Sequence, residues 1–180
     1  MNDNVVKIAE DATKGQSKSS LWYELRYGRI TASKIYEAGN CKTSDGTLVE
    51  TIIGAHKIRE TRAMKRGIKL EKEVLRRVEE ELKIKLKPCG IILKREYPIF
   101  GASPDAIADD FVVEIKCPNS VKALSNYIKD GLIANKYKAQ VHLQMFTAQK
   151  QKGLFCIAQP DFETSKKINF LWVNFDKDYV

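Results

Sequence analysis

Residues 103–118, which read SPDAIADDFVVEIKCP, contain four acidic residues and one lysine, and among these Asp105, Glu114 and Lys116 could gather into one cluster. Residues 111–115 are rich in β-branched and aromatic side chains and follow a turn-like Asp-Asp pair, so they are predicted to form a strand. Side chains alternate between the two faces of a strand, which places Glu114 and Lys116 on one face. The lysine is therefore expected to lie beside the glutamate.

A second acid, Asp105, is expected to reach the same place. Residues 97–100 are predicted to form a short strand, and residues 101–105 would lead around to the strand at 111–115 as a hairpin. A buried carboxylate is costly unless it is paired or bound to a metal, so Asp105 and Glu114 suit a hard cation with oxygen ligands. Mg²⁺ or Mn²⁺ with open water positions facing a phosphate is the usual arrangement for phosphodiester chemistry.

Glu71 is the third acid in this hypothesis. It begins the helical pattern EKEVLRRVEEELKI, whose apolar stripe consists of Val74, Leu75, Val78 and Leu82. By helical spacing Glu71 lies on that stripe and points inward. The alternative interpretation is a stripe-edge glutamate near a helix start, where a negative charge is favoured anyway. Asp105 and Glu114 have a similar alternative, as a turn aspartate and an edge-strand glutamate paired with a neighbouring lysine.

A later helix, predicted over residues 134–150, carries amides on one face. That face is formed by Tyr137, Gln140, Val141, Gln144 and Met145. The amides could orient a lysine, a water molecule or a phosphate, or they could be core-edge groups satisfied locally. His56 and His142 have no spacing that indicates a metal site or a nucleophilic triad, so surface or core histidines are expected. The run RAMKRG at 62–67 fits either a strip that contacts phosphate or a solvated helix end.

The composition favours a polyanionic partner. Lys and Arg number 31 against 23 Asp and Glu, a formal charge of +8, which favours nucleic acid although many basic proteins bind none. No apolar run approaches about 18 residues and the polar start lacks a signal-peptide core, so a soluble intracellular protein, in cytoplasm or nucleus, is expected, with no membrane partner. The widely spaced Cys41, Cys89, Cys117 and Cys156 are expected to be reduced thiols, mostly buried, and indicate neither zinc nor disulfides.

The predicted elements run helices, strands, helices, strands, which indicates an α+β or mixed α/β domain around a central sheet. Residues 1–19 are polar and aperiodic and are expected to be a flexible arm, followed by a single domain over residues 20–180. The predicted helices are 20–27, 31–39, 48–87 with a break near Gly67, 120–130 and 134–150, and the predicted strands are 90–93, 97–100, 111–115, 154–158 and 168–175.

Five ordered motifs resemble one family. Ser103-Pro104-Asp105 followed by Glu114-Ile115-Lys116 resembles the core of the PD-(D/E)xK nuclease superfamily. WYELRYGRITAS (22–33), RGIKLE (66–71), VEIKCP (113–118) and YKAQVHLQM (137–145) together look like the lambda-exonuclease, or YqaJ-type viral recombinase, group within it. The resemblance spans the chain from Trp22 onward and implies a restriction-endonuclease-like core, a central mixed β-sheet flanked by helices.

The resemblance also implies a role for each matching residue. The residues that it assigns to catalysis are Glu71, Asp105, Glu114, Lys116 and Gln140. Asp105 and Glu114 match metal-binding carboxylates, and the backbone carbonyl of Ile115 would supply a further ligand. Glu71 matches the glutamate that completes the acidic site, directly or through water. Lys116 matches the catalytic lysine, and Gln140 matches the active-site glutamine of the later helix.

Three further residues match positions that contact the 5′-phosphate of a DNA end in this family: Arg26, Ser33 and Ser103. Arg26 is expected near the end of a short helix and Ser33 in the first turn of the next, where unpaired backbone N–H groups suit an anion. Trp22 would pack this segment against the core. The alternative is that Arg26 pairs with a nearby acid such as Glu24 or Glu37, while Ser33 merely supports the helix start.

The resemblance implies a Mg²⁺-dependent deoxyribonuclease, with Mn²⁺ as a substitute, that degrades double-stranded DNA from its ends in the 5′-to-3′ direction and leaves 5′-phosphate products. Such activity belongs to DNA recombination or repair. Relatives work beside a single-strand annealing protein and some form toroidal trimers, so a partner and a homo-oligomer of these kinds are expectations from the resemblance alone. The alternatives are an endonuclease, an exonuclease of other polarity, and a non-catalytic DNA-binding module.

Overall fold

The computed structural model describes residues 2–54 and 61–179. Its helices are α1 (Asp3–Ala12), the 3-10 helix η1 (Gln16–Lys18), α2 (Ser20–Arg26), α3 (Ile35–Asn40), α4 (Thr47–Ile52), α5 (Arg62–Leu82), α6 (Val121–Leu124), α7 (Asn135–Ala148), α8 (Phe162–Ser165) and the 3-10 helix η2 (Lys177–Tyr179). Its strands are β1 (Ile30–Thr31), β2 (Ile92–Leu93), β3 (Phe100–Ala102), β4 (Ala106–Ile107), β5 (Phe111–Lys116), β6 (Ile128–Lys129), β7 (Leu132–Ile133), β8 (Lys152–Ala158) and β9 (Ile168–Asn174).

The central sheet has the strand order β4-β5-β8-β9. β5 and β8 run parallel, with Glu114 opposite Phe155, whereas β4 pairs antiparallel with β5 and β9 antiparallel with β8. Residues 111–115 of β5 are all buried. A near-continuous apolar strand of this kind is typical of one covered on both faces, so the mixed α/β class predicted from the sequence is confirmed.

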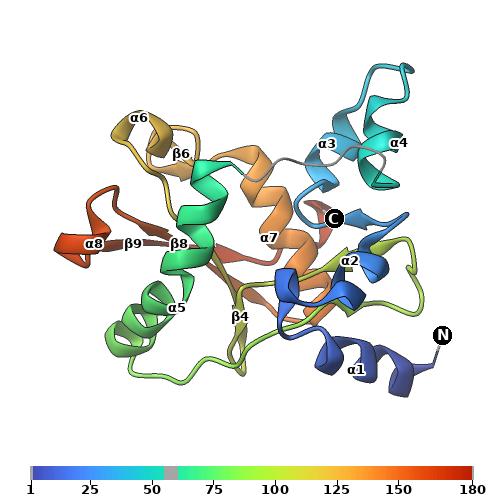
Figure 1. The fold of residues 1–180 in the computed structure, drawn as a ribbon, viewed down its shortest axis with the longest axis horizontal. Coiled ribbons are helices and arrows are strands. Elements are labelled where there is room, and N and C mark those ends of the chain that lie inside the picture. The colour runs from blue at the N-terminus through green and yellow to red at the C-terminus, as the bar shows by residue number, and fades with distance from the viewer. Residues whose placement is uncertain (1, 55–60, 180) are drawn as a thin grey trace.

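The two faces of the sheet bury different side chains of β5. Phe111, Val113 and Ile115 pack with residues of α5, whereas Val112 packs with residues of α7. The strand prediction and its alternation are therefore confirmed. α7 belongs to the connection between the parallel strands β5 and β8. It packs so closely on β8 that a Cβ atom at Gly153 would overlap the side chain of Val141. Figure 1 shows α5 and α7 on either side of the strands.

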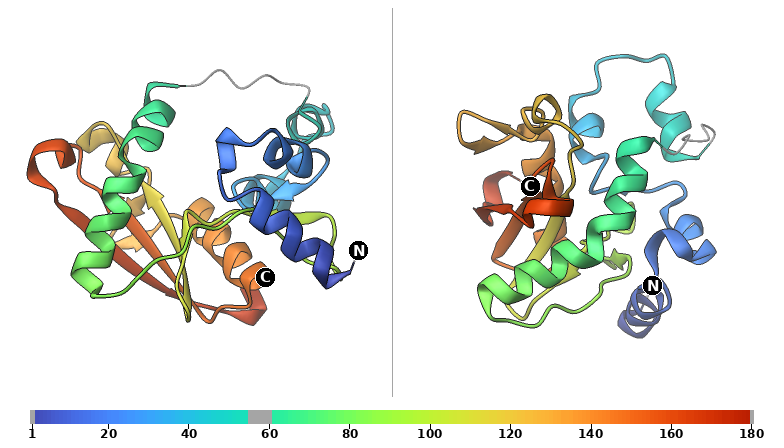
Figure 2. Two further views of the ribbon diagram at one scale, coloured as in Figure 1. Left: turned by 60° about the horizontal axis from the view of Figure 1, so that its bottom comes forward. Right: turned by 60° about the vertical axis from the view of Figure 1, so that its left-hand side comes forward.

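A second, smaller sheet has the order β1-β3-β2 and is joined by the N-terminal helices. β1 runs parallel to β3, and Ala32 N donates to Gly101 O at 3.0 Å, so the segment that follows β1 lies beside the one that follows β3. The chain passes from β3 directly into β4 of the central sheet. Figure 2 shows the N-terminal helices gathered on one side of the molecule and α5 on the other.

The predicted hairpin between residues 97–100 and 111–115 is wrong. β3 pairs with β1 and β2, and the hairpin partner of β5 is β4, which the sequence did not indicate. β4 and β5 are separated by only residues 108–110, and such short connections favour pairing between sequential strands. Asp105 still reaches the edge of β5, because its N–H donates to Val113 O at 3.0 Å.

The N-terminal segment is also not the flexible arm that its polar composition predicted. α1 begins after Asn2, whose side chain accepts from Val5 N, and Thr13 at its end is fully buried. Val5, Ile8, Ala9 and Ala12 recur at helical spacing, a pattern that the prediction from overall polar composition overlooked. Its position depends on contacts with residues more than 70 positions away, such as the hydrogen bond between Thr13 Oγ1 and Ile91 N.

Other boundaries differ from the prediction. α5 continues through Gly67 without a break, since burial of its apolar face outweighs the cost of about 1 kcal/mol for a helical glycine. The helix predicted at 31–39 begins only at Ile35, because residues 30–31 pair with β3. The helix predicted at 120–130 is a single turn, α6, followed by a β6–β7 hairpin whose turn, Asp130-Gly131, has positive φ at both residues.

Part of the helix predicted at 48–87 lies outside the described residues, as does His56. Among the described residues, Cys41, Cys89, Cys117 and Cys156 are free thiols, and three of them are buried, as expected. No helix in the described part of the chain is long and apolar enough to cross a membrane.

Candidate active site

The candidate site forms where three elements of the core meet. β5 carries Glu114 and Lys116, α7 carries Gln140 and Gln144, and α5 carries Glu71. Asp105 lies immediately before β4, at the edge of β5. The structure therefore brings together the acids, the lysine and the glutamine that the sequence singled out.

Glu114 is the most enclosed acid of the group, with only 3% of its surface exposed. Its Oε1 accepts from Lys116 Nζ at 2.5 Å and from Gln140 Nε2 at 2.6 Å, and its Oε2 accepts from Gln144 Nε2 at 2.6 Å. Buried charges need such partners, because each unpaired one costs several kcal/mol by order of magnitude. The inward amides thus hold the orientation of Glu114. From the sequence, they could have oriented a lysine, a water molecule or a phosphate, or have been core-edge groups satisfied locally.

Asp105 is held by the backbone of β5. Its Oδ2 accepts from Ile115 N at 2.6 Å, and its own N–H donates to Val113 O at 3.0 Å, so both bonds lie along the same edge of β5. The N–H and C=O of one strand residue point to the same side, so the Ile115 carbonyl faces the same edge. Burial raises the pKa of Asp105 well above its ordinary value, and the nearby carboxylates of Glu114 and Glu71 add to this, while Lys116 opposes it.

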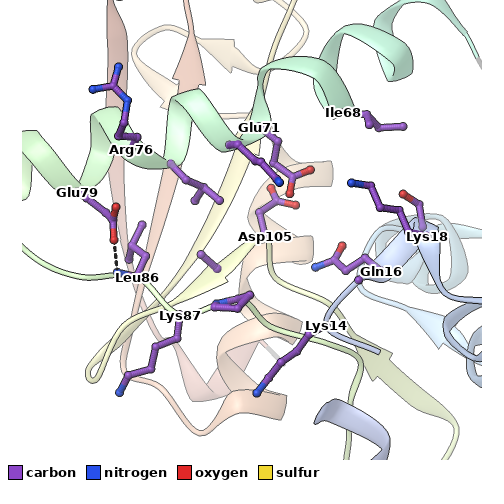
Figure 3. A pocket seen from close by; sticks show the side chains of 16 residues that line it. Lys14, Gln16, Lys18, Ile68, Glu71, Arg76, Glu79, Leu86, Lys87 and Asp105 are labelled. Carbon is purple, nitrogen blue, oxygen red and sulfur yellow. Dashed lines mark hydrogen bonds between the residues drawn. The ribbon is translucent and has the colours of Figure 1, made fainter. Parts of the chain in front are cut away.

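Glu71 lines the same cavity as Asp105. The cavity has a volume of about 460 Å³ and is lined by α5, by residues 14–18 and by residues 86–88 and 105–106. Figure 3 shows the carboxylates of Glu71 and Asp105 turned toward each other. Partial burial raises the pKa of Glu71, and repulsion from Glu114 raises it further. The inward orientation predicted from helical spacing is confirmed.

Lys116 is the positive charge within this acidic group. Burial opposes its charged form, but the carboxylates of Glu114 and Asp105 outweigh burial and raise its pKa above the ordinary value. Its ammonium also lies 5.3 Å from the centre of the Tyr137 ring. Lys116 therefore holds its proton at neutral pH, which suits stabilisation of negative charge rather than removal of a proton.

Three carboxylates share one partly buried lysine, so the site has an excess of negative charge. Oxygen donors in such a setting are the ligands that hard divalent cations prefer. Among the described residues, no three His, Cys, Asp or Glu side chains form a ready-made metal cluster. Lys116 and two amides instead occupy the oxygens of Glu114. The residues thus fit a divalent cation by charge and donor type.

Two of the three residues predicted to bind a 5′-phosphate, Arg26 and Ser103, contact Trp22. Its Nε1 donates to Ser103 Oγ at 2.9 Å, and the Arg26 guanidinium stacks over its ring at 4.0 Å. Ser33 lies beside the segment after β3 and shares a 3.2 Å hydrogen bond with Thr31 Oγ1, but it precedes α3 rather than lying in its first turn. Burial lowers the pKa of Arg26.

The alternative role for Arg26 is not observed. No described carboxylate lies within ion-pair distance of its guanidinium. Glu37 pairs instead with Lys34 and with Lys136, each at 2.7 Å. A half-buried arginine that stacks on an indole and has no acidic partner among the described residues remains available for an anion.

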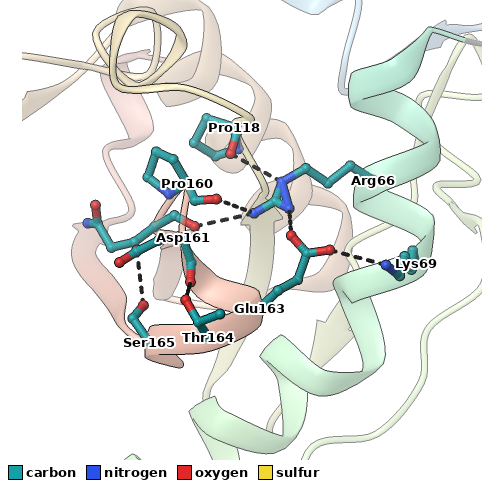
Figure 4. A network of polar contacts seen from close by, with 9 residues as sticks. Arg66, Lys69, Pro118, Pro160, Asp161, Glu163, Thr164 and Ser165 are labelled. Carbon is teal, nitrogen blue, oxygen red and sulfur yellow. Dashed lines mark hydrogen bonds and ion pairs between the residues drawn. The ribbon is translucent and has the colours of Figure 1, made fainter.

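Sequence reasoning missed the role of Arg66. Its side chain is 12% exposed and donates to Glu163 Oε2 at 2.5 Å and to the carbonyls of Pro118 and Pro160 at 3.3 and 2.9 Å. Figure 4 shows these contacts, with Lys69 on the outer side of Glu163. Arg66 is thus neither a phosphate contact nor a solvated helix end, the two options that the sequence left. It ties α5 to the loop that follows β5.

His142 is a core residue, 1% exposed, whose Nδ1 contacts Lys138 O at 2.8 Å. This agrees with the expected core or surface role. Burial lowers its pKa, so the neutral ring is favoured.

The fold and the site define a restriction-endonuclease-like nuclease core. The model of the YqaJ-like viral recombinase domain matches residues 21–151. The chain therefore belongs to the YqaJ-like viral recombinase family.

Relatives agree with this assignment. The alkaline nuclease of Human herpesvirus 7 (strain JI) is 32% identical over 107 residues, which cover 57% of this chain. The match spans only 21% of the length of that protein. An alkaline exonuclease, LHK-Exo, from Laribacter hongkongensis has a TM-score of 0.73 and 25% identity, covering 87% of this chain and 82% of that one. The complex of LHK-Exo with dAMP gives a TM-score of 0.75 at 25% identity over 88% and 83% of the two chains.

Proposed function

We propose that this protein is a metal-dependent DNA exonuclease that acts on the ends of duplex DNA. The observation that carries the proposal is the arrangement of Asp105, Glu114 and Lys116 at one edge of β5, with Gln140 and Glu71 around them. The family assignment supports it, since the two relatives named above are a nuclease and an exonuclease.

The metal would be Mg²⁺, with Mn²⁺ as a substitute. Asp105, Glu114 and the Ile115 carbonyl would hold it, with Glu71 binding directly or through water. A bound divalent ion would polarise the phosphate and lower the pKa of a water molecule for in-line attack. Lys116 would stabilise the charge that develops on the phosphate. Gln140 and Gln144 would keep Glu114 in place.

The surroundings of the acids suit a polyanion. Cationic side chains line the same cavity as Glu71 and Asp105, namely Lys14, Lys18, Lys72, Arg76 and Lys87. Such a rim attracts phosphates electrostatically, while the acidic floor would repel them unless a cation is bound. This contrast favours a nucleic-acid backbone as the ligand and metal as a requirement.

The proposed direction is 5′ to 3′, with 5′-phosphate products. Its support is the group of Arg26, Trp22, Ser33 and Ser103, which lies on α2 and just after β1 and β3. Ser103 is two residues from Asp105 in the chain, so a phosphate held by Ser103 and Arg26 would lie near the acids. Binding the terminal 5′-phosphate there would present the adjacent phosphodiester to the site.

Two partners complete the proposal on the basis of the family alone. A single-strand annealing protein would take up the strand that digestion exposes. A homotrimer would enclose the duplex. Light scattering of the purified protein at several concentrations would measure the oligomeric state directly.

The decisive experiment incubates the purified protein with linear and with closed circular duplex DNA, in Mg²⁺ or in EDTA. An exonuclease degrades only the linear substrate and only with metal. Cutting of the closed circle would indicate an endonuclease, and end labelling of the linear duplex would identify the opposite polarity. Binding without cutting would indicate a DNA-binding module and would contradict the proposal. The Asp105→Asn variant is the control for a contaminating nuclease.

A further inference from the structure

The segment between α1 and α2 precedes the region that the family model matches, yet it is docked on the site. Thr13 Oγ1 accepts from Ile91 N at 2.9 Å. Gln16 Nε2 donates both to Cys89 O at 3.0 Å and to Pro104 O at 2.8 Å. Pro104 is the residue before Asp105, so residues 13–18 contact the chain directly beside the acidic site.

Two features show that this docking is tight. Gly90 lies so close to α1 that a Cβ atom there would overlap Glu10 O and Thr13 Oγ1. Gln16 has a φ of 44°, a left-handed conformation that is uncommon for a residue with a side chain. Its two side-chain hydrogen bonds fix this conformation. A strained residue held in this way indicates a segment with a defined position.

Residues 14–18 form one wall of the cavity, and α5 forms the opposite wall. Figure 3 shows the side chain of Lys18 directed across the cavity toward Glu71 and Asp105. The charge of Lys18 acts on Glu71, whose pKa it lowers against the larger effect of burial. Lys14 differs, since its ammonium pairs with Asp11 at 2.6 Å.

Lys18 has an exposed side chain and no ion pair with any described carboxylate. The Lys18 ammonium faces the carboxylates of Glu71 and Asp105 across the cavity (Figure 3). One ligand in the cavity could contact both the ammonium and a cation held by these carboxylates. A phosphodiester group can do this, because one of its oxygens can face the ammonium while others face a metal held by the acids.

We propose that residues 13–18 are a wall of the active-site cleft and that Lys18 on this wall binds a backbone phosphate of the DNA substrate. This inference deepens the proposed nuclease function and rests on it. It assigns substrate binding to a segment outside residues 21–151, which the family model matches.

The test compares Lys18→Gln with Lys7→Gln. Lys7 is a matched control, because it lies on the same N-terminal segment, is exposed and pairs with Glu10 and Asp11 away from the cavity. Lys18→Gln should raise KM for linear duplex about fivefold to tenfold, with kcat within about twofold. The slope of log KM against log salt concentration should fall by about one. Lys7→Gln should leave both unchanged, and Lys18→Arg should restore most of the affinity.

Binding is also measured without cleavage, by fluorescence anisotropy of labelled duplex with both lysine variants in the Asp105→Asn background. This readout separates the two proposals: a wild type that does not cut DNA overturns the nuclease function, while weaker binding by Lys18→Gln still supports the wall. Equal affinity and equal salt slope for Lys18→Gln and Lys7→Gln would overturn the role of Lys18. Unchanged melting temperatures exclude misfolding as the cause.

Discussion

Lys116 Nζ and Glu114 Oε1 lie 2.5 Å apart on one face of β5. Two residues on a strand that are separated by one position share a face, so the sequence itself imposes this pair. The carboxylate keeps the lysine charged, and the lysine reduces the cost of burying the carboxylate. A metal ion that binds Glu114 would compete with Lys116 for the same oxygen.

Lys116→Ala should lower kcat about 10²-fold or more, because a fixed positive charge beside the reacting phosphate is lost. DNA affinity should change by less than about threefold, since most phosphate contacts lie elsewhere. Steady-state cleavage at saturating DNA measures the first quantity and anisotropy the second. A variant that cuts at the normal rate once saturated would remove Lys116 from the mechanism.

Asp105→Asn and Glu114→Gln should each lower cleavage about 10³-fold or more while DNA binding remains measurable, because both are proposed metal ligands. The matched control is Glu96→Gln, which changes an exposed carboxylate outside the cavity. Cleavage rates are compared over a range of Mg²⁺ concentrations. Full activity of either site variant would exclude its carboxylate as a required ligand.

The raised pKa of Asp105 predicts a dependence of stability on pH. A carboxyl group with a higher pKa in the folded state binds its proton more tightly there, so its stabilisation is present at low pH. This contribution is lost as pH rises through the folded-state pKa. At pH 7 without metal, Asp105→Asn should therefore melt at a higher temperature than wild type.

Melting curves at pH 7 and near pH 4.5 check this sign. The difference between the two proteins should shrink at the lower pH, and Mg²⁺ at pH 7 should raise the melting temperature of wild type more than that of Asp105→Asn. About 1 kcal/mol corresponds to about 2–4 °C for a chain of this size, so the shift is measurable. A variant less stable than wild type at pH 7 without metal would contradict the prediction.

Arg66→Lys should reduce both stability and kcat, because lysine cannot reach Glu163 and two backbone carbonyls at once. We expect a loss of about 1–3 kcal/mol in the free energy of unfolding. The Mg²⁺ concentration for half-maximal activity should also rise, since α5 carries Glu71. Lys69→Gln is the control, because Lys69 contacts the same Glu163 from an exposed position. Equal effects of the two substitutions would argue against a positioning role for Arg66.

Wild type should degrade 5′-phosphorylated duplex faster than 5′-hydroxyl duplex, by about tenfold if Arg26 binds the terminal phosphate. Arg26→Ala should remove this preference while its rate on the 5′-hydroxyl duplex stays near that of wild type. Parallel digestion of the two substrates gives both ratios. Equal wild-type rates would leave a nuclease that does not recognise the 5′ end in this way.

The features that could be predicted best from the sequence depend on local periodicity. The alternation of β5, the inward side of α7 and the inward direction of Glu71 all come from residue spacing within one element, and each is confirmed. The roles of Glu71, Asp105, Glu114, Lys116 and Gln140 in catalysis stay predictions, although the structure brings these residues together.

The features that could not be predicted depend on pairing between distant segments. Proximity in the sequence predicts that β3 pairs with β5, yet β3 pairs with β1, about 70 residues earlier in the chain. Gln16 and Arg66 look like ordinary polar residues, because they donate to backbone carbonyls 52 to 94 positions away, and the one side-chain partner of Arg66, Glu163, is also distant in the sequence. Backbone acceptors carry no side-chain signature, so no pattern in the sequence marks such contacts.

The hydrogen bond from Ile115 N to the Asp105 side chain has a practical consequence for inactive variants. β4 begins only at residue 106, so the Asp105 carboxylate, rather than another strand, accepts from the N–H of the buried Ile115. Asparagine at this position still offers an oxygen to that N–H, whereas alanine leaves it without this acceptor. Asp105→Ala would thus confuse lost chemistry with a locally loosened strand end, and crystals of a substrate complex are better sought with asparagine.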